Sequence, residues 1–160
     1  MAARSTCAVW IAGATRTGGT IQAESYSSSS GVSTHAAGTG TVLGSIDGGD
    51  WVGYQGVDFG AGSDLFTAFA GVDDPYADKG VEIHPDSVTG PLIGVLNVAA
   101  TGGFDTLARQ STSIVPTSGV HSAFLVAPGN APGFGNLDYF SLTRAATCQV
   151  PPSRSTGGAP

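Results

Sequence analysis

The sequence predicts an all-β fold, an antiparallel β-sandwich of the jelly-roll type, and two observations support this prediction. Glycine accounts for 25 of the 160 residues, while charged residues make up only 11%, a balance typical of short strands joined by tight turns. Several segments also alternate side chains with the two-residue period of a strand, most clearly residues 50–59. We find neither an amphipathic helical pattern nor an internal repeat.

The first part of the chain supplies three expected strands. Residues 8–12 (AVWIA) form a short apolar run, and residues 20–26 (TIQAESY) alternate between two faces. A polar loop is expected at 27–40. A Gly-rich turn then leads into 50–59 (DWVGYQGVDF), where the alternation favours a half-buried strand.

The remaining strands follow at short, regular intervals. Residues 63–72 (SDLFTAFAGV) alternate large and small side chains, and an acidic loop at 73–79 comes next. Further strands are expected at 80–84, 91–99, 104–114, 119–127 and 135–144, with a turn at 85–90. Short strands separated by Gly, Pro, Asp and Ser turns indicate an antiparallel sandwich.

The chain is long enough for one domain, and its pattern does not indicate two. We expect an N-terminal extension with one strand at 1–19, the β-sandwich at 20–148 and a linker-like tail at 149–160 (QVPPSRSTGGAP). The tail suggests that another module follows in a longer parent protein. No membrane span or leader sequence is expected within these residues, because no apolar run reaches the required length.

The charge pattern disfavours nucleic acids and anionic membranes as partners. Twelve carboxylates outnumber six cations, which gives a net charge of −6. Only Lys79 lies between Arg16 and Arg109, so no basic stripe is available to follow phosphates.

The two cysteines, Cys7 and Cys148, lie near the two margins of the expected domain. They could be unrelated buried residues. We favour a disulfide between them, because antiparallel sandwiches often bring their first and last strands together. Such a bond would indicate an oxidising, extracellular compartment.

Patterns for catalysis are weak, and three oxygen-bearing side chains either form a metal site or are simply solvated strand residues. Two glutamates and ten aspartates show no evident pairing, and the three histidines have no Gly-x-Ser-x-Gly motif beside them. Gln22 and Glu24 share one face of an early strand, and Asp138 lies in the last strand, which a sandwich would place beside the first. Hard oxygen ligands of this kind suit calcium. The acidic loop lacks the ligand pattern of an EF-hand, and we interpret it as a solvated turn.

Seven segments occur in the order and spacing of a known family. They are residues 21–26 (IQAESY), 30–32 (SGV), 46–52 (IDGGDWV), 86–94 (DSVTGPLIG), 101–104 (TGGF), 119–121 (GVH) and 136–140 (NLDYF). Over about residues 20–143 the chain therefore resembles family 6 carbohydrate-binding modules, with the related family 35 as the nearest alternative. The resemblance implies a jelly roll, a structural calcium, a non-catalytic role and attachment to a secreted glycan-degrading enzyme.

The resemblance also implies which residues bind calcium and sugar. The calcium ligands would be Gln22, Glu24 and Asp138, completed by backbone carbonyls. The family's main sugar site lies in loops at one edge of the sandwich, where two aromatic rings clasp a pyranose beside an Asn and a polar residue. The matching positions here are Phe104 for one ring, Ser45 for the other, Asn136 for the Asn and His35 for the polar residue, often Glu in the family.

Because Ser45 stands at the position of the second ring, the site would lack one of its two stacking aromatics. A single benzene ring should bind a sugar weakly. Phe134 or Tyr76 could supply the missing ring, although Phe134 could equally fill the end of the sandwich. We assign Trp51 and Tyr139 to core or strand packing.

The sequence thus predicts a secreted, monomeric, calcium-bearing module that binds a neutral or acidic polysaccharide through Phe104, Asn136 and His35. A structural or interaction jelly roll that has lost glycan binding is the main alternative, favoured by Ser45 and Phe104, and a small catalytic sandwich is a weaker one. The concave sheet face, the family's second known surface, is the other place where a glycan could bind.

Overall fold

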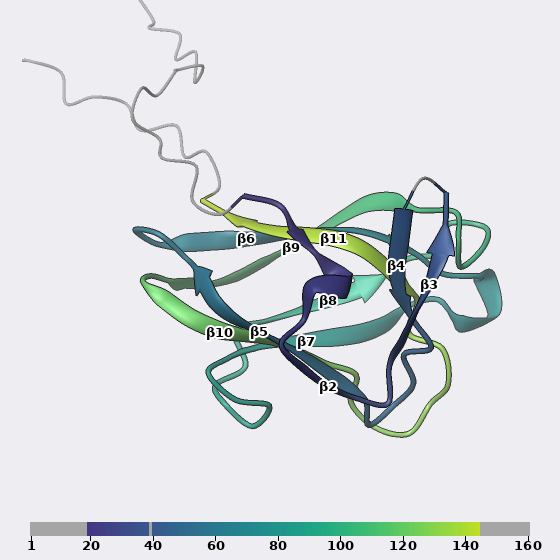
Figure 1. Cartoon of the computed structure of the whole chain (residues 1–160), viewed down its shortest axis with the longest axis horizontal. Helices are drawn as coiled ribbons and strands as arrows, with labels where there is room; N and C mark the ends of the chain where they lie inside the picture. The colour runs from purple at the N-terminus through teal and green to yellow at the C-terminus, as the bar shows by residue number, and fades with distance from the viewer. Residues whose placement is uncertain (1–18, 39, 145–160) are drawn as a thin grey trace, which may run out of the picture.

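A computed structural model of the chain describes residues 19–38 and 40–144, which form two antiparallel sheets packed face to face (Figure 1). The predicted β-sandwich of the jelly-roll type is confirmed. The strands of the described residues are β1 (Ile21–Gln22), β2 (Ser28–Ser30), β3 (Ser33–Ala37), β4 (Gly40–Gly44), β5 (Trp51–Asp58), β6 (Ser63–Gly71), β7 (Lys79–Pro85), β8 (Gly94–Val98), β9 (Ala108–Thr117), β10 (Val120–Val126) and β11 (Asn136–Thr143). Two short 3-10 helices, η1 (Ala23–Ser25) and η2 (Asp74–Tyr76), accompany them.

One sheet has the order β3-β4-β11-β6-β9, with β1 added beside β11, and the other has the order β2-β5-β10-β7-β8. The chain crosses between the sheets at most connections, so the loops gather at the two ends of the sandwich. The loops at 45–50, 72–78, 99–107 and 127–135 form one end, which we call the distal end. Residues 19 and 144 lie at the opposite end (Figure 1).

The core lies between the sheets and contains the inward-facing residues of both. Phe140 is fully buried on β11, with its ring centroid 4.9 Å from that of Tyr54 and 5.3 Å from that of Phe66. The Tyr54 hydroxyl, also buried, donates a hydrogen bond to the Ala23 carbonyl at 2.7 Å. On β6 the alternation matches the inward face of Phe66, Ala68 and Ala70. On β5 the strict alternation was wrong, because the buried residues change parity between Tyr54 and Val57, where the pairing with β10 shifts its register.

The predictions for residues 20–40 were wrong in two places. The expected strand at 20–26 ends after Gln22, where the Ser25 hydroxyl donates to the Gln22 carbonyl at 2.7 Å and helps to close the turn of η1. The expected loop at 27–40 instead contains β2 and β3. Both strands are mostly exposed and lie at sheet edges, so they lack the apolar alternation that reveals a half-buried strand.

The expected strand at 104–114 begins later, at Ala108. The preceding residues form a turn, in which the Thr106 amide donates to the Gly103 carbonyl at 3.2 Å and the Thr101 hydroxyl donates to the same carbonyl at 3.0 Å. This turn keeps Phe104 out of the ladder and places it at the distal end.

The expected strand at 8–12, the tail at 149–160, and both Cys7 and Cys148 lie outside the described residues. Within the described part of the chain, no helix has the length and apolar character needed to cross a membrane.

Candidate functional site

Two aromatic rings meet at the distal end. Phe104 comes from the loop between β8 and β9 and Tyr76 from η2, and their ring centroids lie 5.4 Å apart with the planes tilted by 48°. Phe104 is half-buried and packs against the core cluster. Of the two candidates for the missing second ring, the structure places Tyr76 beside Phe104.

Tyr76 is held in place from two sides. Gly133 has a φ of +70°, and a Cβ there would lie 2.6 Å from Tyr76 Cδ1, so a residue with a side chain would be strained and would collide with the ring. Lys79 Nζ donates to the Tyr76 carbonyl at 2.9 Å and lies 5.2 Å from the ring centroid, within cation–π range. The ring is therefore positioned before any ligand arrives.

Phe134 does not contribute to this surface. Its exposed fraction is 3%, and it packs in the core cluster. The prediction that Phe134 is a ligand-binding residue is contradicted by this burial, since its ring fills the end of the sandwich.

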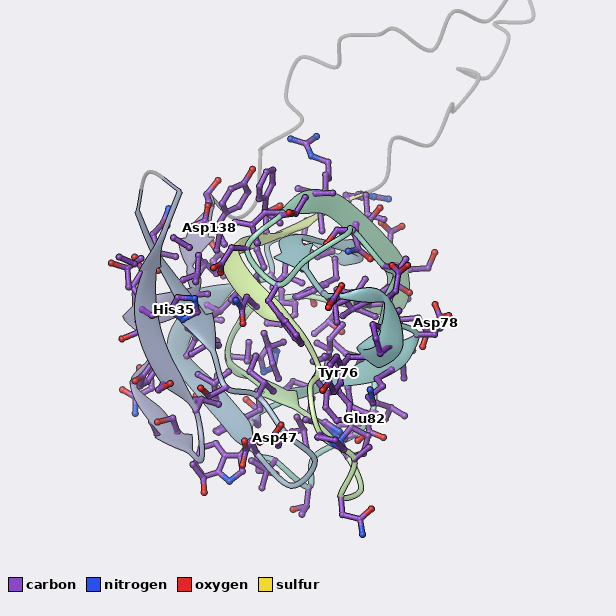
Figure 2. All side chains as sticks on the ribbon, turned by 90° about the vertical axis from the view of Figure 1, so that its right-hand side faces the viewer. His35, Asp47, Tyr76, Asp78, Glu82 and Asp138 are labelled. Atoms are coloured by element: carbon purple, nitrogen blue, oxygen red, sulfur yellow. The ribbon has the colours of Figure 1, made fainter. Side chains whose placement is uncertain are left out.

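A polar cluster at the same end joins three residues distant in sequence. Asp105 Oδ1 accepts hydrogen bonds from His35 Nε2 at 3.0 Å and from Asn136 Nδ2 at 2.9 Å. His35 comes from β3 and Asn136 is the first residue of β11; Figure 2 views the sandwich from this end, with His35 and Tyr76 labelled. The bond from His35 is the main cause that lowers the pKa of Asp105, with a further contribution from Asn136. The structure thus brings Asn136 and His35 together, as the resemblance implied.

The cluster can form because β4 ends in a glycine. A Cβ on Gly44 would lie 2.8 Å from Asn136 Oδ1 and 2.9 Å from His35 Cε1. Both contacts are closer than real Cβ atoms tolerate, so the absence of a side chain at Gly44 leaves the space that the two polar groups occupy.

Ser45 follows directly and offers no stacking surface. The residue is exposed with a φ of +55°, and its hydroxyl accepts a hydrogen bond from the Ser33 hydroxyl at 2.9 Å. Ser45 thus links the start of β3 to the end of β4.

The expected metal ligands lie around η1. Glu24 Oε2 is a buried oxygen without a hydrogen-bond partner among the described residues. Burial, and secondly the charge of Glu24, raises the pKa of Asp138. Gln22 lies opposite Tyr139, the residue that follows Asp138 on β11. No group of three or more His, Cys, Asp or Glu side chains within 19–38 and 40–144 could hold a metal ion, so any cation here would also need amide or carbonyl oxygens.

A second aromatic pair lies on the outer face of the five-stranded sheet. The rings of Trp51 and Phe124 are 5.8 Å apart, and a Cβ on Gly53 would lie 2.5 Å from Phe124 Cε1. Trp51 is half-buried on this face, and Tyr139 stacks on Phe69 at 5.3 Å on the outer face of the other sheet. Both residues pack against a neighbouring strand, as expected.

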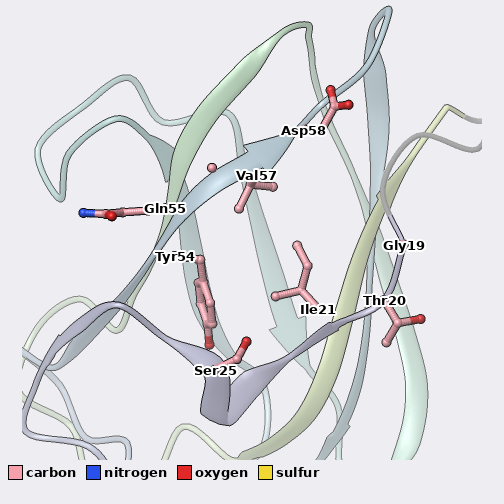
Figure 3. Close-up of a pocket in the computed structure, with 9 residues that line it drawn as sticks. Gly19, Thr20, Ile21, Ser25, Tyr54, Gln55, Val57 and Asp58 are labelled. Carbon is pink, nitrogen blue, oxygen red and sulfur yellow. The ribbon is translucent and has the colours of Figure 1, made fainter.

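A hollow of about 370 Å³ lies between β1 and β5, with none of the residues of the distal end in its lining (Figure 3). Its one aromatic ring among the described residues is that of Tyr54, which is buried and already hydrogen-bonded to Ala23. A buried ring offers no face for a sugar, and we therefore place the candidate site at the distal end.

Comparison with known proteins identifies the family of this chain. A model of the family "Carbohydrate binding module (family 6)" matches residues 22–144. The chain is 35% identical to a family 6 carbohydrate-binding module from Clostridium cellulolyticum, solved in complex with xylose, with a TM-score of 0.72; the match covers 79% of this chain and 97% of that module.

Two curated enzymes contain a similar segment. Endo-1,4-beta-xylanase A of Thermoclostridium stercorarium is 34% identical over 134 residues, which is 82% of this chain and 25% of the xylanase. An arabinoxylan arabinofuranohydrolase of Bacillus subtilis (strain 168) is 38% identical over 101 residues, 62% of this chain and 19% of that enzyme. The chain spans a quarter or less of these relatives. The family match and the shared fold together show that this chain belongs to the family 6 carbohydrate-binding modules, which are non-catalytic.

Proposed function

We propose that this module binds xylan-type polysaccharides at the distal end and thereby directs an attached glycan-degrading enzyme to its substrate. The observation that supports this most strongly is the contact between Tyr76 and Phe104 beside the polar cluster of His35, Asp105 and Asn136. A pyranose has apolar C–H faces and polar hydroxyl edges, so it needs an aromatic surface and hydrogen-bonding groups side by side.

The choice of xylan follows from the relatives. One similar module was solved with xylose, and the curated relatives are a xylanase and an arabinoxylan arabinofuranohydrolase. The parent protein of this module is, on this proposal, a secreted xylan-degrading enzyme. A disulfide between Cys7 and Cys148 and a monomeric state complete the proposal, both carried forward from the sequence.

The test is titration of xylotetraose and soluble xylan into the wild type and into Phe104→Ala and Tyr76→Ala, with melting curves for each variant. Loss of one stacked ring should weaken binding by roughly ten- to a hundredfold while the fold persists. Trp51→Ala is the matched aromatic control, because it removes a ring from the outer sheet face.

If Trp51→Ala abolishes binding and the other two variants do not, the glycan binds on the sheet face and the distal-end proposal is wrong. If the wild type binds none of a panel of plant polysaccharides, the alternative of an interaction module without glycan binding is favoured.

We also propose a structural calcium ion held by Glu24, Asp138 and Gln22, together with backbone carbonyls. The buried oxygen of Glu24 that has no partner within the described residues, and the repulsion between two neighbouring carboxylates, both fit a bound cation. Such an ion would neutralise the two carboxylates and fix η1 against β11. Melting curves in calcium and in EDTA test this proposal, since a metal bound only by the native state raises the melting temperature.

A further inference from the structure

Asp105 is the carboxylate of the polar cluster, and it is both held in place and exposed. Its Oδ1 is fixed by hydrogen bonds from His35 at 3.0 Å and Asn136 at 2.9 Å. The side chain is nevertheless 58% exposed, and Oδ2 accepts no hydrogen bond from the described residues. A fixed carboxylate with one free oxygen can accept a hydrogen bond from a ligand without first losing side-chain freedom.

Asn136 is in the opposite situation. The residue is 4% exposed, its amide nitrogen donates to Asp105, and its Oδ1 faces the backbone at Gly44. The amide nitrogen is therefore committed to Asp105, and Oδ1 occupies the space that a side chain at position 44 would fill. Asn136 supports Asp105 from beneath and presents little surface to a sugar.

Asp105 has no lysine or arginine as an ion-pair partner among the described residues. Its partner there is His35, and Lys79 Nζ donates instead to the Tyr76 carbonyl at 2.9 Å. His35 lowers the pKa of Asp105 through its hydrogen bond, so the carboxylate is ionised at neutral pH. An anionic group placed beside Asp105 would meet a like charge.

We propose that Asp105, which directly follows the stacking residue Phe104, hydrogen-bonds the sugar and makes the site select neutral sugars over those that carry a carboxylate. Asn136 and His35 are then positioning residues that hold Asp105. This inference rests on the proposed function, because it assigns specificity within the same glycan site.

The test compares two probes of equal backbone length, xylotetraose and a xylotetraose that carries a glucuronic acid branch, by titration calorimetry. The wild type should bind the neutral probe at least about tenfold more tightly, and this ratio should shrink in 1 M salt, where charges are screened within about 3 Å. Asp105→Asn keeps the side-chain shape and the Oδ1 acceptor but replaces the charged oxygen by an amide nitrogen. This variant should lose about ten- to a hundredfold in affinity for the neutral probe and bring the ratio close to one.

Two further variants separate the roles. Asn136→Ala should weaken binding of both probes but keep the ratio, because the carboxylate remains. Asp74→Asn removes an equal charge from an exposed position in η2, and it should leave both affinities and their ratio unchanged.

The inference is overturned if Asp105→Asn keeps the wild-type ratio, if Asn136→Ala changes the ratio as much as Asp105→Asn does, or if the wild type binds both probes equally. Phe104→Ala distinguishes this failure from failure of the proposed function. If Phe104→Ala abolishes binding while Asp105→Asn keeps the ratio, only the role of Asp105 is wrong. If Phe104→Ala binds as the wild type does, the glycan site itself is misplaced.

Discussion

Gly44→Ala should damage the candidate site without changing any residue that lines it. A Cβ at position 44 would lie 2.8 Å from Asn136 Oδ1 and 2.9 Å from His35 Cε1, whereas ordinary contact begins at 3.4 Å. Asn136 is buried and His35 is exposed, so we expect the His35 ring to swing outward and the Asn136 amide to turn. The hydrogen bonds to Asp105 would then weaken or break.

The cost in stability should be modest. A hydrogen bond to a charged group is worth about 1.5–3 kcal/mol, but Asp105 is more than half exposed and water can replace the lost donors. We therefore expect a loss of about 1 kcal/mol, or roughly 3–5 °C in melting temperature for a domain of this size. Affinity for xylotetraose should fall about tenfold or more, because the polar cluster no longer holds Asp105.

Gly40→Ala is the matched control, since it lies on the same strand and a Cβ there meets nothing within 4 Å. Calorimetric titration and melting curves of the two variants measure both effects. If Gly44→Ala folds and binds as tightly as Gly40→Ala, the arrangement of His35, Asp105 and Asn136 has no part in binding and the reasoning is refuted.

Three other predictions concern the fold and its ions. Adding calcium to metal-free protein should raise the melting temperature more at pH 7 than at pH 4, because burial and then the charge of Glu24 raise the pKa of Asp138, and the metal-free protein loses stability as pH rises through that raised pKa. Asp138→Asn should remove the difference, and an equal effect of calcium at both pH values would contradict this. His121 has its pKa raised by the hydrogen bond to the Ser118 carbonyl and then by Asp86, so its stabilising contribution should be present below the ordinary histidine pKa and lost as pH rises through the raised one. Melting curves from pH 5 to 9 should show that loss in the wild type and not in His121→Gln. Phe140→Ala should cost about 3–5 kcal/mol in urea unfolding, since it empties the centre of the core, and a cost below 1 kcal/mol would place the core elsewhere.

The sequence predicted most of the strands that bury one face, but it missed β4, although Val42 and Leu43 are fully buried there. In β6 the buried residues Phe66, Ala68 and Ala70 alternate with half-buried ones. This burial of one face produces the two-residue period from which the strand is predicted. The serine-rich β2 and the exposed β3 bury no such face. These two strands form because they pair with β5 and β4, and the residues within them show no pattern that would predict the pairing.

The site was predictable only in part for a similar reason. Phe104, Asn136 and His35 could be assigned from matched motifs, and the structure brings Asn136 and His35 into one cluster. Asp105 was missed, although it directly follows Phe104. Asp105 is held by a hydrogen bond from His35, which lies 70 residues away in sequence. Only the folded β3–β4 hairpin brings the two side chains together, so the sequence gives no local sign of this contact.

The direction of β11 has a consequence for how the module can work in a longer chain. Asn136 begins this strand at the distal end and Thr143 ends it at the opposite end, a span of eight residues or about 25 Å. Gly19 enters beside that second end (Figure 1). A domain joined through residue 19 or 144 would therefore be attached at the opposite end of the sandwich from the proposed glycan site. On that proposal, the length of β11 sets the least distance between the attachment points and the bound polymer.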